Sequence, residues 1–212
     1  MNLTEQLKAH ADKSKSRLPL QSLETMQSAI DELVTSSLLE SAAKKGSTIP
    51  EIILPNATGK LVNLNTILEN NKVVLTFYRG GWCPYCNLEL KAFQKVLPQI
   101  EEKGAKLIAI SPETPDNSLS TSEKNNLSFE VLSDDNNEVA RALGLVFKMP
   151  ESLQKLYKSS FGIDLVQSQQ NTNQELPIAA TYVIEKDGTI SYAFLSEDYK
   201  LRANPSEVIA AL

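Results

Sequence analysis

The sequence is poor in the residues that most often hold metals or cross-link a fold. It has two cysteines, one histidine and one tryptophan among 212 residues. A structural zinc ion needs four ligands, and Cys83, Cys86 and the distant His10 do not supply them. We therefore expect no metal and no bound cofactor. A metal shared between two chains is the only arrangement that would complete a ligand set.

The sequence also lacks a long hydrophobic run and a basic stretch. Its first 19 residues carry charges throughout, so we expect neither a signal peptide nor a membrane span, and a cytoplasmic protein without a membrane partner. Acidic residues outnumber basic ones by 26 to 21, and the formal net charge is -5 without clustered Lys or Arg. The electrostatic footprint of a nucleic-acid-binding protein is missing, so nucleic acid is not an expected partner.

The first part of the chain has a helical pattern. Apolar residues between Leu20 and Ala43 recur at spacings of three and four, and a shorter helix is expected before Pro19. We assign residues 1–46 to a helical N-terminal extension and residues 47–212 to the main domain. The apolar stripe of the extension favours packing on its own domain; the alternative is an arm that forms a homodimer.

The main domain alternates strand-like and helix-like segments, which indicates an α/β fold. A buried strand at 73–78, a helix from Pro84 to about Lys103 and a strand at 105–111 form a βαβ unit with parallel strands. Turn signals predict a hairpin within 46–72 and another within 179–195. The remaining expected elements are helices at 114–126, 136–145 and from Asn204, a third parallel strand at 127–134, and a helix plus extended loop at 148–176. The order predicts a central mixed sheet flanked by helices.

Both cysteines lie where the first buried strand gives way to the helix, in the stretch Trp82-Cys83-Pro84-Tyr85-Cys86. A Cys-x-x-Cys pair beside a βαβ pattern in a reducing compartment indicates redox chemistry before a structural disulfide. Cys83 would cap the helix and Pro84 would be its first residue. The competing interpretation is two ordinary buried cysteines.

The helix start predicts different roles for the two thiols. The positive end of the helix dipole would lower the pKa of Cys83 below the free value of about 8.5 and make it an exposed nucleophile. Cys86, one turn further in, would have a higher pKa and resolve the mixed disulfide. We therefore expect a catalytic pair in which Cys83 attacks and Cys86 becomes its disulfide partner.

Few other residues near the motif suggest a supporting role. Arg79 could stabilise a thiolate, although a surface arginine is an equal expectation. Trp82 and Tyr85 flank the thiols and either cover the reactive sulfur or simply pack. The only histidine, His10, lies in a polar stretch and is expected to be solvated, so no Cys-His pair is foreseen.

Several stretches resemble the peroxiredoxin-like branch of the alkyl hydroperoxide reductase and thiol-specific antioxidant family. They are VVLTFYRGGWCPYC, AKLIAISPETP, FEVLSDDNNEVARALGL and ATYVIEKDGTISYAF. The resemblance covers roughly residues 47–212 and implies a thioredoxin-like fold.

The same short motif fits two patterns within this superfamily. The peroxiredoxin spacing places Arg79 at the family proline, Cys83 at the family threonine and Cys86 at the peroxidatic cysteine. The thioredoxin pattern makes Cys83 the nucleophile, and Cys-Pro-Tyr-Cys is also the motif of dithiol glutaredoxins. The family arginine falls on Ala179, and so does the position expected for the thioredoxin cis-proline. The nearest proline is Pro177, which either faces the motif through a shifted register or is a trans proline that starts the strand.

The resemblance implies an antioxidant enzyme that reduces peroxides with electrons from a thioredoxin or glutathione system. The alternative enzyme exchanges thiols and disulfides on protein or glutathione disulfides without direct peroxide chemistry. The alternative outside catalysis is a redox-sensing interaction module that docks a partner according to the state of Cys83 and Cys86.

Overall fold

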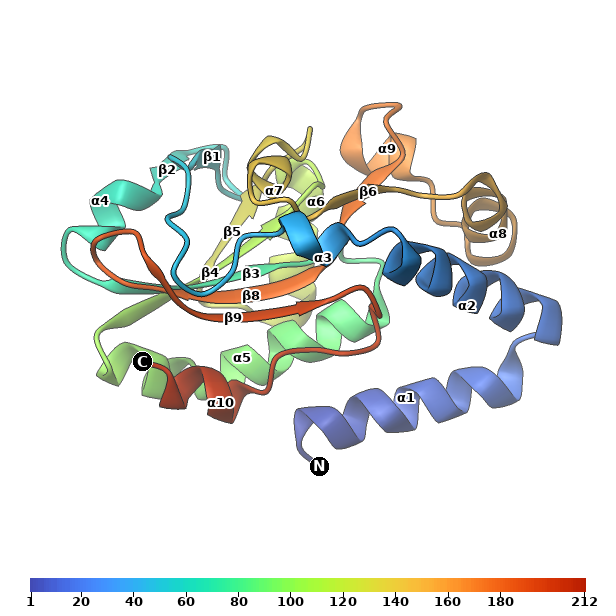
Figure 1. The fold of residues 1–212 in the computed structure, drawn as a ribbon, viewed down its shortest axis with the longest axis horizontal. Coiled ribbons are helices and arrows are strands. Elements are labelled where there is room, and N and C mark those ends of the chain that lie inside the picture. The colour runs from blue at the N-terminus through green and yellow to red at the C-terminus, as the bar shows by residue number, and fades with distance from the viewer.

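The computed structural model describes all residues, 1–212, and centres on a five-stranded mixed sheet (Figure 1). The strand order is β5-β4-β3-β8-β9; β3, β4 and β5 are parallel, and β8 and β9 are antiparallel to their neighbours. Their bounds are β3 Lys72–Phe77, β4 Ala105–Ser111, β5 Glu130–Ser133, β8 Ala179–Ile184 and β9 Ile190–Ser196. The predicted βαβ unit, third parallel strand and final hairpin are confirmed.

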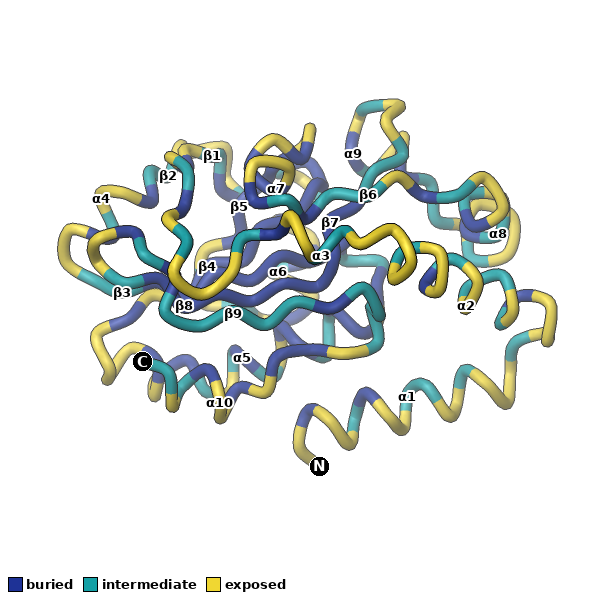
Figure 2. Tube along the Cα trace, viewed as in Figure 1, coloured by how far each residue is buried: buried dark blue, intermediate teal, exposed yellow.

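Both faces of this sheet are buried, because side chains alternate along a strand and helices cover both sides. Val73 and Leu75 of β3 join the larger core on one face, whereas Val74 joins a second core on the other. That second core is formed with α5 (Pro84–Glu102) and α10 (Pro205–Ala210), which lie along one side of the sheet in Figure 1. Strand β8 is accordingly dark blue in Figure 2, whereas the edge strand β9 is mostly teal, since its central residues are only partly buried.

The remaining helices and small strands surround the sheet. The predicted first hairpin is confirmed as β1 paired with β2. Helix α4 was not predicted, and neither was the small β6–β7 sheet, because three-residue strands and a five-residue helix carry too few positions for a periodic pattern. The bounds are β1 Ile53–Pro55, β2 Leu61–Asn63, α4 Leu64–Leu68, α6 Pro115–Asn125, α7 Glu138–Ala142, β6 Val146–Lys148 and β7 Glu175–Pro177.

The segment 148–176 is more ordered than the predicted helix plus loop. It contains α8 (Glu151–Phe161) and α9 (Leu165–Gln169), followed by β7. Asp164 caps α9 by accepting a hydrogen bond from the Val166 backbone at 3.1 Å. An aspartate at this position satisfies an amide that the helix itself leaves unpaired, so a sequence rich in Ser, Gln and Asn still forms a helical turn.

The N-terminal extension consists of α1 (Leu3–Arg17), α2 (Leu20–Thr35) and the short α3 (Leu38–Ser41). Helix α1 runs beside α5, and Leu3 and Leu7 are buried there, while α2 lies against α8. The expectation that the extension packs on its own domain is confirmed. The proposed boundary at residue 46 stays a prediction.

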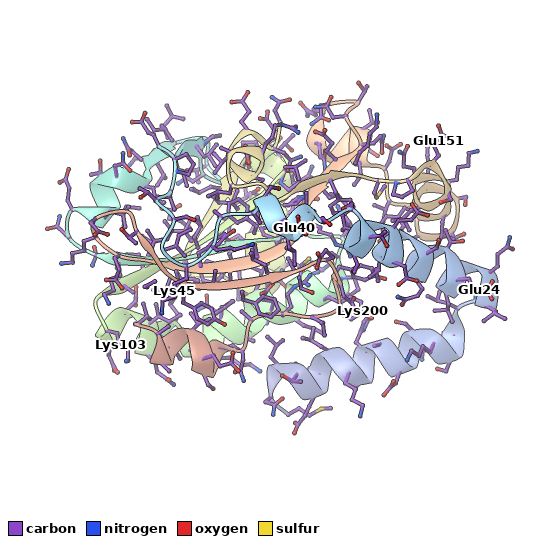
Figure 3. All side chains as sticks on the ribbon, in the orientation of Figure 1. Glu24, Glu40, Lys45, Lys103, Glu151 and Lys200 are labelled. Carbon is purple, nitrogen blue, oxygen red and sulfur yellow. The ribbon has the colours of Figure 1, made fainter.

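Charged side chains dominate the outside of the molecule. Of the six labelled in Figure 3, five are exposed and Lys200 is half-buried; they are Glu24, Glu40, Lys45, Lys103, Glu151 and Lys200. No helix combines the length and the apolar composition needed to cross a membrane.

Candidate active site

The redox motif follows a tight turn at the end of β3. Gly80 has φ +149°, and a Cβ there would lie 2.3 Å from Nε1 of Trp82, so the position requires glycine. The Cys83 amide donates to the Gly80 carbonyl at 3.0 Å, and Pro84 occupies the first turn of α5. The predicted helix start is confirmed: Cys83 is the N-cap residue of α5.

The predicted exposure of the attacking sulfur is wrong, since Cys83 and Cys86 are both 0% exposed. They share an apolar cluster with Leu3 and Leu7 of α1, because the extension covers the start of α5. The sulfur of Cys83 also makes no capping hydrogen bond with the helix backbone. The helix end alone therefore does not account for its activation.

Arg79 supplies the cation that the thiol needs. Its Nη2 donates to Cys83 Sγ at 3.2 Å, and its Nη1 donates to the Tyr157 hydroxyl at 3.2 Å. The guanidinium lies 4.0 Å from the ring centroid of Tyr199 and 5.2 Å from that of Trp82. Among the ion pairs of the molecule, none includes Arg79. A buried cation without a carboxylate partner favours a thiolate at Cys83.

The pKa values of the two thiols move in opposite directions. Burial by itself raises the pKa of Cys83, but the hydrogen bond with Cys86 and the charges of Arg79 and Arg202 outweigh it, so the pKa lies well below its ordinary value. Burial raises the pKa of Cys86, and the neighbouring charge of Cys83 raises it further. This arrangement matches the expected division between attacking and resolving thiols.

A second arginine, which the sequence gave no reason to select, serves Cys86. Arg202, from the loop before α10, donates from Nη2 to Cys86 Sγ at 3.2 Å. Its Nε lies 2.8 Å from Oε2 of Glu89, and both side chains are almost completely buried. Burial raises the pKa of Glu89 to about 7 even though Arg202 opposes the shift. Unlike Arg79, Arg202 therefore has a carboxyl group as its neighbour.

One of these missed residues was detectable. Glu89 follows Cys86 by three positions and precedes Leu90, so it lies on the buried face of α5. A charged residue on the apolar face of a helix needs a buried partner. Arg202 lies 113 positions further along the chain (202 minus 89) and carries no local signal.

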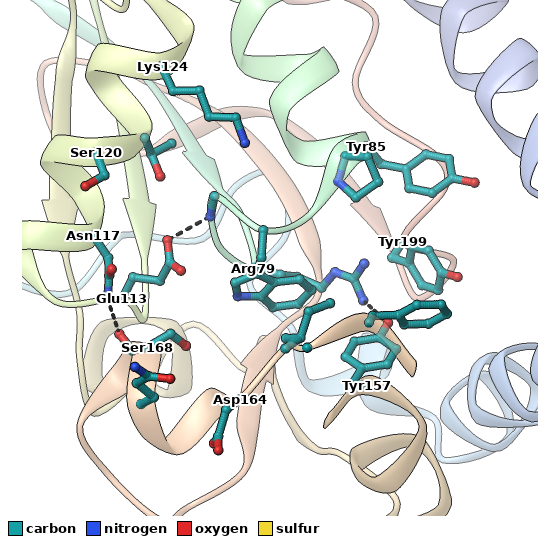
Figure 4. A pocket seen from close by; sticks show the side chains of 18 of the residues that line it. Arg79, Tyr85, Glu113, Asn117, Ser120, Lys124, Tyr157, Asp164, Ser168 and Tyr199 are labelled. Atoms are coloured by element: carbon teal, nitrogen blue, oxygen red, sulfur yellow. Dashed lines mark hydrogen bonds between the residues drawn. The ribbon is translucent and has the colours of Figure 1, made fainter. Parts of the chain in front are cut away.

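A second buried carboxyl group holds the turn before the thiols. Oε2 of Glu113, after β4, accepts a hydrogen bond from the Gly81 amide at 2.7 Å, as Figure 4 shows. Burial raises the pKa of Glu113 to about 7. Glu113 thus connects the end of β4 to the turn that positions Cys83.

A cavity of about 1090 Å³ opens beside this turn. Arg79, Gly81, Trp82, Pro84 and Tyr85 line its inner end, whereas neither cysteine does. In Figure 4 Arg79 lies between Glu113 on one side and the ring of Tyr199 on the other. The supporting residues Arg79, Trp82, Pro84 and Tyr85 are thus brought together around Cys83.

Two sequence-based expectations about side chains fail here. His10 was expected to be solvated, but it packs edge-on against Tyr85 with ring centroids 4.8 Å apart and lines the cavity. The chain fold, not the local sequence, brings α1 to this place. Pro177 is a trans proline that ends β7 opposite Val146, and it lies neither among the lining residues nor in the apolar cluster of the cysteines.

The site contains no grouping of metal ligands. Nowhere are three or more His, Cys, Asp or Glu side chains arranged to hold a metal ion, and both cysteines are free thiols. The site combines two thiols, two guanidinium groups and two carboxyl groups of raised pKa, of which Arg79 and Glu113 line the cavity.

The sequence model of the AhpC/TSA family matches residues 45–193, which contain the whole motif. The chain belongs to this family. Among similar curated members, peroxiredoxin Q of Gentiana triflora is 29% identical over 150 residues, 71% of this chain and 58% of that protein. The putative peroxiredoxin bcp of Buchnera aphidicola is 30% identical over 125 residues, 57% of this chain and 78% of that protein. The chain thus spans less than two thirds of the plant relative.

Solved structures of the family share the fold. The peroxidoxin BcpB of Mycobacterium tuberculosis superposes with a TM-score of 0.64 at 22% identity, over 79% of this chain and 95% of that one. The bacterioferritin comigratory protein of Xanthomonas campestris gives a TM-score of 0.59 at 18% identity, over 80% and 96%. The thioredoxin-like fold implied by the resemblance is confirmed, with α1 and α2 outside the region that the family model matches.

Proposed function

We propose that this protein is a thiol peroxidase in which Cys83 is the peroxidatic thiolate and Cys86 its resolving partner. The thiolate attacks one peroxide oxygen, an S–O bond forms, and the O–O bond breaks. The sulfur is oxidised to a sulfenic acid, and the departing oxygen takes up one proton to leave as water or an alcohol. Family membership supports peroxide as the substrate class.

The observation that carries the proposal is the contact between Arg79 and Cys83. At 3.2 Å from Cys83 Sγ and without a carboxylate partner, the Arg79 guanidinium stabilises the negative sulfur before reaction. Charge moves from this sulfur to the departing oxygen during the attack, and a cation beside both atoms lowers the barrier. Position 179, where the family has an arginine, is Ala179 in this chain. Arg79, from the turn before the motif, takes over the role of that arginine.

In the second step, the sulfenic acid at Cys83 is converted to a disulfide with Cys86. The Cys86 thiol attacks the sulfenic sulfur of Cys83, an S–S bond forms, and the hydroxyl group leaves as water with the thiol proton. Arg202 at 3.2 Å from Cys86 Sγ stabilises the developing thiolate. Two electrons from a thioredoxin- or glutathione-type reductant then restore both thiols. A cytoplasmic location would supply such a reductant.

Thiol-disulfide exchange is the second candidate, favoured by a specific observation. The sulfurs lie one helical turn apart behind a cavity of about 1090 Å³, far larger than a peroxide needs. A disulfide-bearing substrate would enter such a space.

Rapid mixing decides between the candidates. Reduced protein is mixed with hydrogen peroxide or an organic hydroperoxide, Trp82 fluorescence is followed, and sulfenic acid is trapped for mass spectrometry. We expect oxidation far faster than that of free cysteine, with the trap on Cys83 in a C86S variant. A trap on Cys86 in a C83S variant, at the wild-type rate, would reverse the two roles. A rate no better than free thiol, with rapid reaction of a disulfide, would establish the exchange enzyme instead.

A further inference from the structure

The cavity beside the motif is built for a polar molecule larger than a peroxide. Its volume of about 1090 Å³ is slightly above the roughly 300–1,000 Å³ found for small-molecule sites, whereas hydrogen peroxide is little larger than water. Of its 27 lining residues only eight are hydrophobic, so its walls do not suit a lipid chain. A compound the size of a short peptide fits both properties.

One wall of the cavity is basic and comes from the N-terminal extension. Lys13 and Arg17 of α1 line it, and Lys124 of α6 is a further basic lining residue. None of the three takes part in an ion pair, since all six ion pairs of the molecule are formed by other residues. Unpaired cations around a cavity attract carboxylates. Because the family match begins at residue 45, the α1 wall is not part of the matched domain.

The opposite side offers an acceptor for a positive group. Three acidic residues line it, but Glu113 is bonded to the Gly81 amide, and Asp164 pairs with Lys158 at 2.8 Å. Asp116, in the first turn of α6, takes part in no ion pair. The cavity therefore matches a ligand that carries carboxylates together with an ammonium group.

The inner end of the cavity places such a ligand next to the redox pair. Arg79, Trp82 and Pro84 line that end and are the immediate neighbours of Cys83. Both sulfurs are 0% exposed and neither lines the cavity, so a thiol bound there is separated from Cys83 by these lining residues. A small molecule fits a space of about 1090 Å³, whereas a folded protein is far larger than this volume.

We propose that the cavity between α1 and α6 binds a carboxylate-bearing, low-molecular-weight thiol of the glutathione type, which reduces the Cys83–Cys86 disulfide. The inference rests on the proposed function, which creates that disulfide. The inference specifies the class of the reductant, which the chemistry of the two cysteines alone does not determine.

The reduction takes two equivalents of the thiol. The first, as a thiolate, attacks the Cys83 sulfur; a mixed disulfide forms, and Cys86 leaves as a thiolate beside Arg202, 3.2 Å away. The second attacks the outer sulfur of the mixed disulfide and releases Cys83 as a thiolate beside Arg79. The thiol is oxidised to its symmetrical disulfide, and both cysteines are restored after Cys86 takes up a proton.

The test measures steady-state peroxide consumption by the full chain, with either glutathione or dithiothreitol as the reductant. Charge reversal on the α1 wall, K13E/R17E, is compared with K8E/K15E, which reverses two exposed lysines of α1 outside the cavity. We expect K13E/R17E to raise KM for glutathione about tenfold relative to KM for dithiothreitol. Turnover of the same variant with dithiothreitol also shows that the variant is folded. K8E/K15E should leave both unchanged.

Salt provides a second measurement on the unmodified protein. KM for glutathione should rise between low salt and 0.5 M salt, whereas KM for the uncharged dithiothreitol should not change. The reason is that the Debye length falls below about 10 Å above 0.1 M salt, so the attraction between the basic side chains and the carboxylates is screened.

Four results would overturn the inference while leaving the peroxidase intact. Two concern the variants: an equal effect of both charge-reversal pairs, and a K13E/R17E effect confined to a carboxylated organic hydroperoxide. Two concern the reductant: turnover linear in glutathione without saturation, and efficient turnover with thioredoxin alone. The peroxidase proposal fails separately: pre-reduced wild-type protein would then not consume one equivalent of peroxide in the absence of any reductant.

Discussion

At the scale of single residues, the site depends on how each buried arginine is neutralised. Arg202 lies 2.8 Å from a carboxyl oxygen of Glu89, so it has a second acidic neighbour besides the Cys86 thiol. Arg79 has only a thiol, a hydroxyl and two aromatic rings around it. Because a buried cation favours a nearby anion, this difference assigns the thiolate to Cys83 although both sulfurs contact an arginine.

Replacing Arg79 tests this assignment. In R79Q the pKa of Cys83 should rise to or above the free thiol value of about 8.5, and the rate of peroxide reduction at pH 7 should fall at least about tenfold. The measurement is the thiolate ultraviolet absorbance as a function of pH, with a C83S protein as the blank. R141Q, which removes an exposed arginine paired with Glu175, is the control and should leave the titration unchanged. A Cys83 titration unaffected by R79Q would contradict the assignment.

At the scale of elements, α1 closes the active site. Its Leu3 and Leu7 pack in the same apolar cluster as Cys83 and Cys86, and its polar side lines the cavity. One helix thus does two things: its apolar residues exclude water from the sulfurs, and its basic residues face the space through which reactants approach. Removal of solvent strengthens the electrostatic effect of Arg79 on the thiolate.

A cavity-creating substitution in α1 should affect stability and reactivity together. L7A removes a side chain that is 7% exposed, and the unfolding free energy should fall by about 2–4 kcal/mol. Alkylation of the cysteines by iodoacetamide under native conditions should accelerate, because the cover over the sulfurs is loosened. L20A, at a position 71% exposed on α2, is the matched control and should change neither quantity. Destabilisation without faster alkylation would show that α1 does not cover the thiols.

At the scale of the whole molecule, buried carboxyl groups make stability depend on pH. The pKa of Glu113 is about 7, against an ordinary value of 4.5, because of burial. Between these values the folded state keeps a proton that the unfolded state has lost, so the unfolding free energy falls as pH rises through about 7. Glu89, also near 7, contributes with the same sign.

The E113Q variant should remove one part of this dependence. Glutamine keeps an oxygen for the Gly81 amide but does not titrate. The loss of stability between pH 5 and pH 8, measured by urea unfolding, should be smaller in E113Q than in the wild type by on the order of 2 kcal/mol. E151Q changes an exposed glutamate on α8 and should retain the full wild-type slope. Equal slopes in wild type and E113Q would refute the raised pKa.

The sequence by itself determined the features that repeat within a short window. Strand and helix periodicity gave the βαβ unit and the final hairpin, and Pro84 after Cys83 gave the start of α5, because local sterics and side-chain alternation act over a few residues. The Cys-x-x-Cys spacing at that start predicts the redox pair that we propose. The sequence did not reveal β6, β7 or α4, whose few residues carry no periodic signal.

Only the tertiary structure decided what surrounds the two sulfurs. Arg202 contacts Cys86 from 116 positions away, and His10 and Leu7 arrive from α1. These contacts arise from how α1 and the loop before α10 pack against α5, which no local pattern encodes. The exposed nucleophile at a helix end, expected from sequence, is instead a buried thiol beside Arg79, since burial and charge pairing depend on the whole fold.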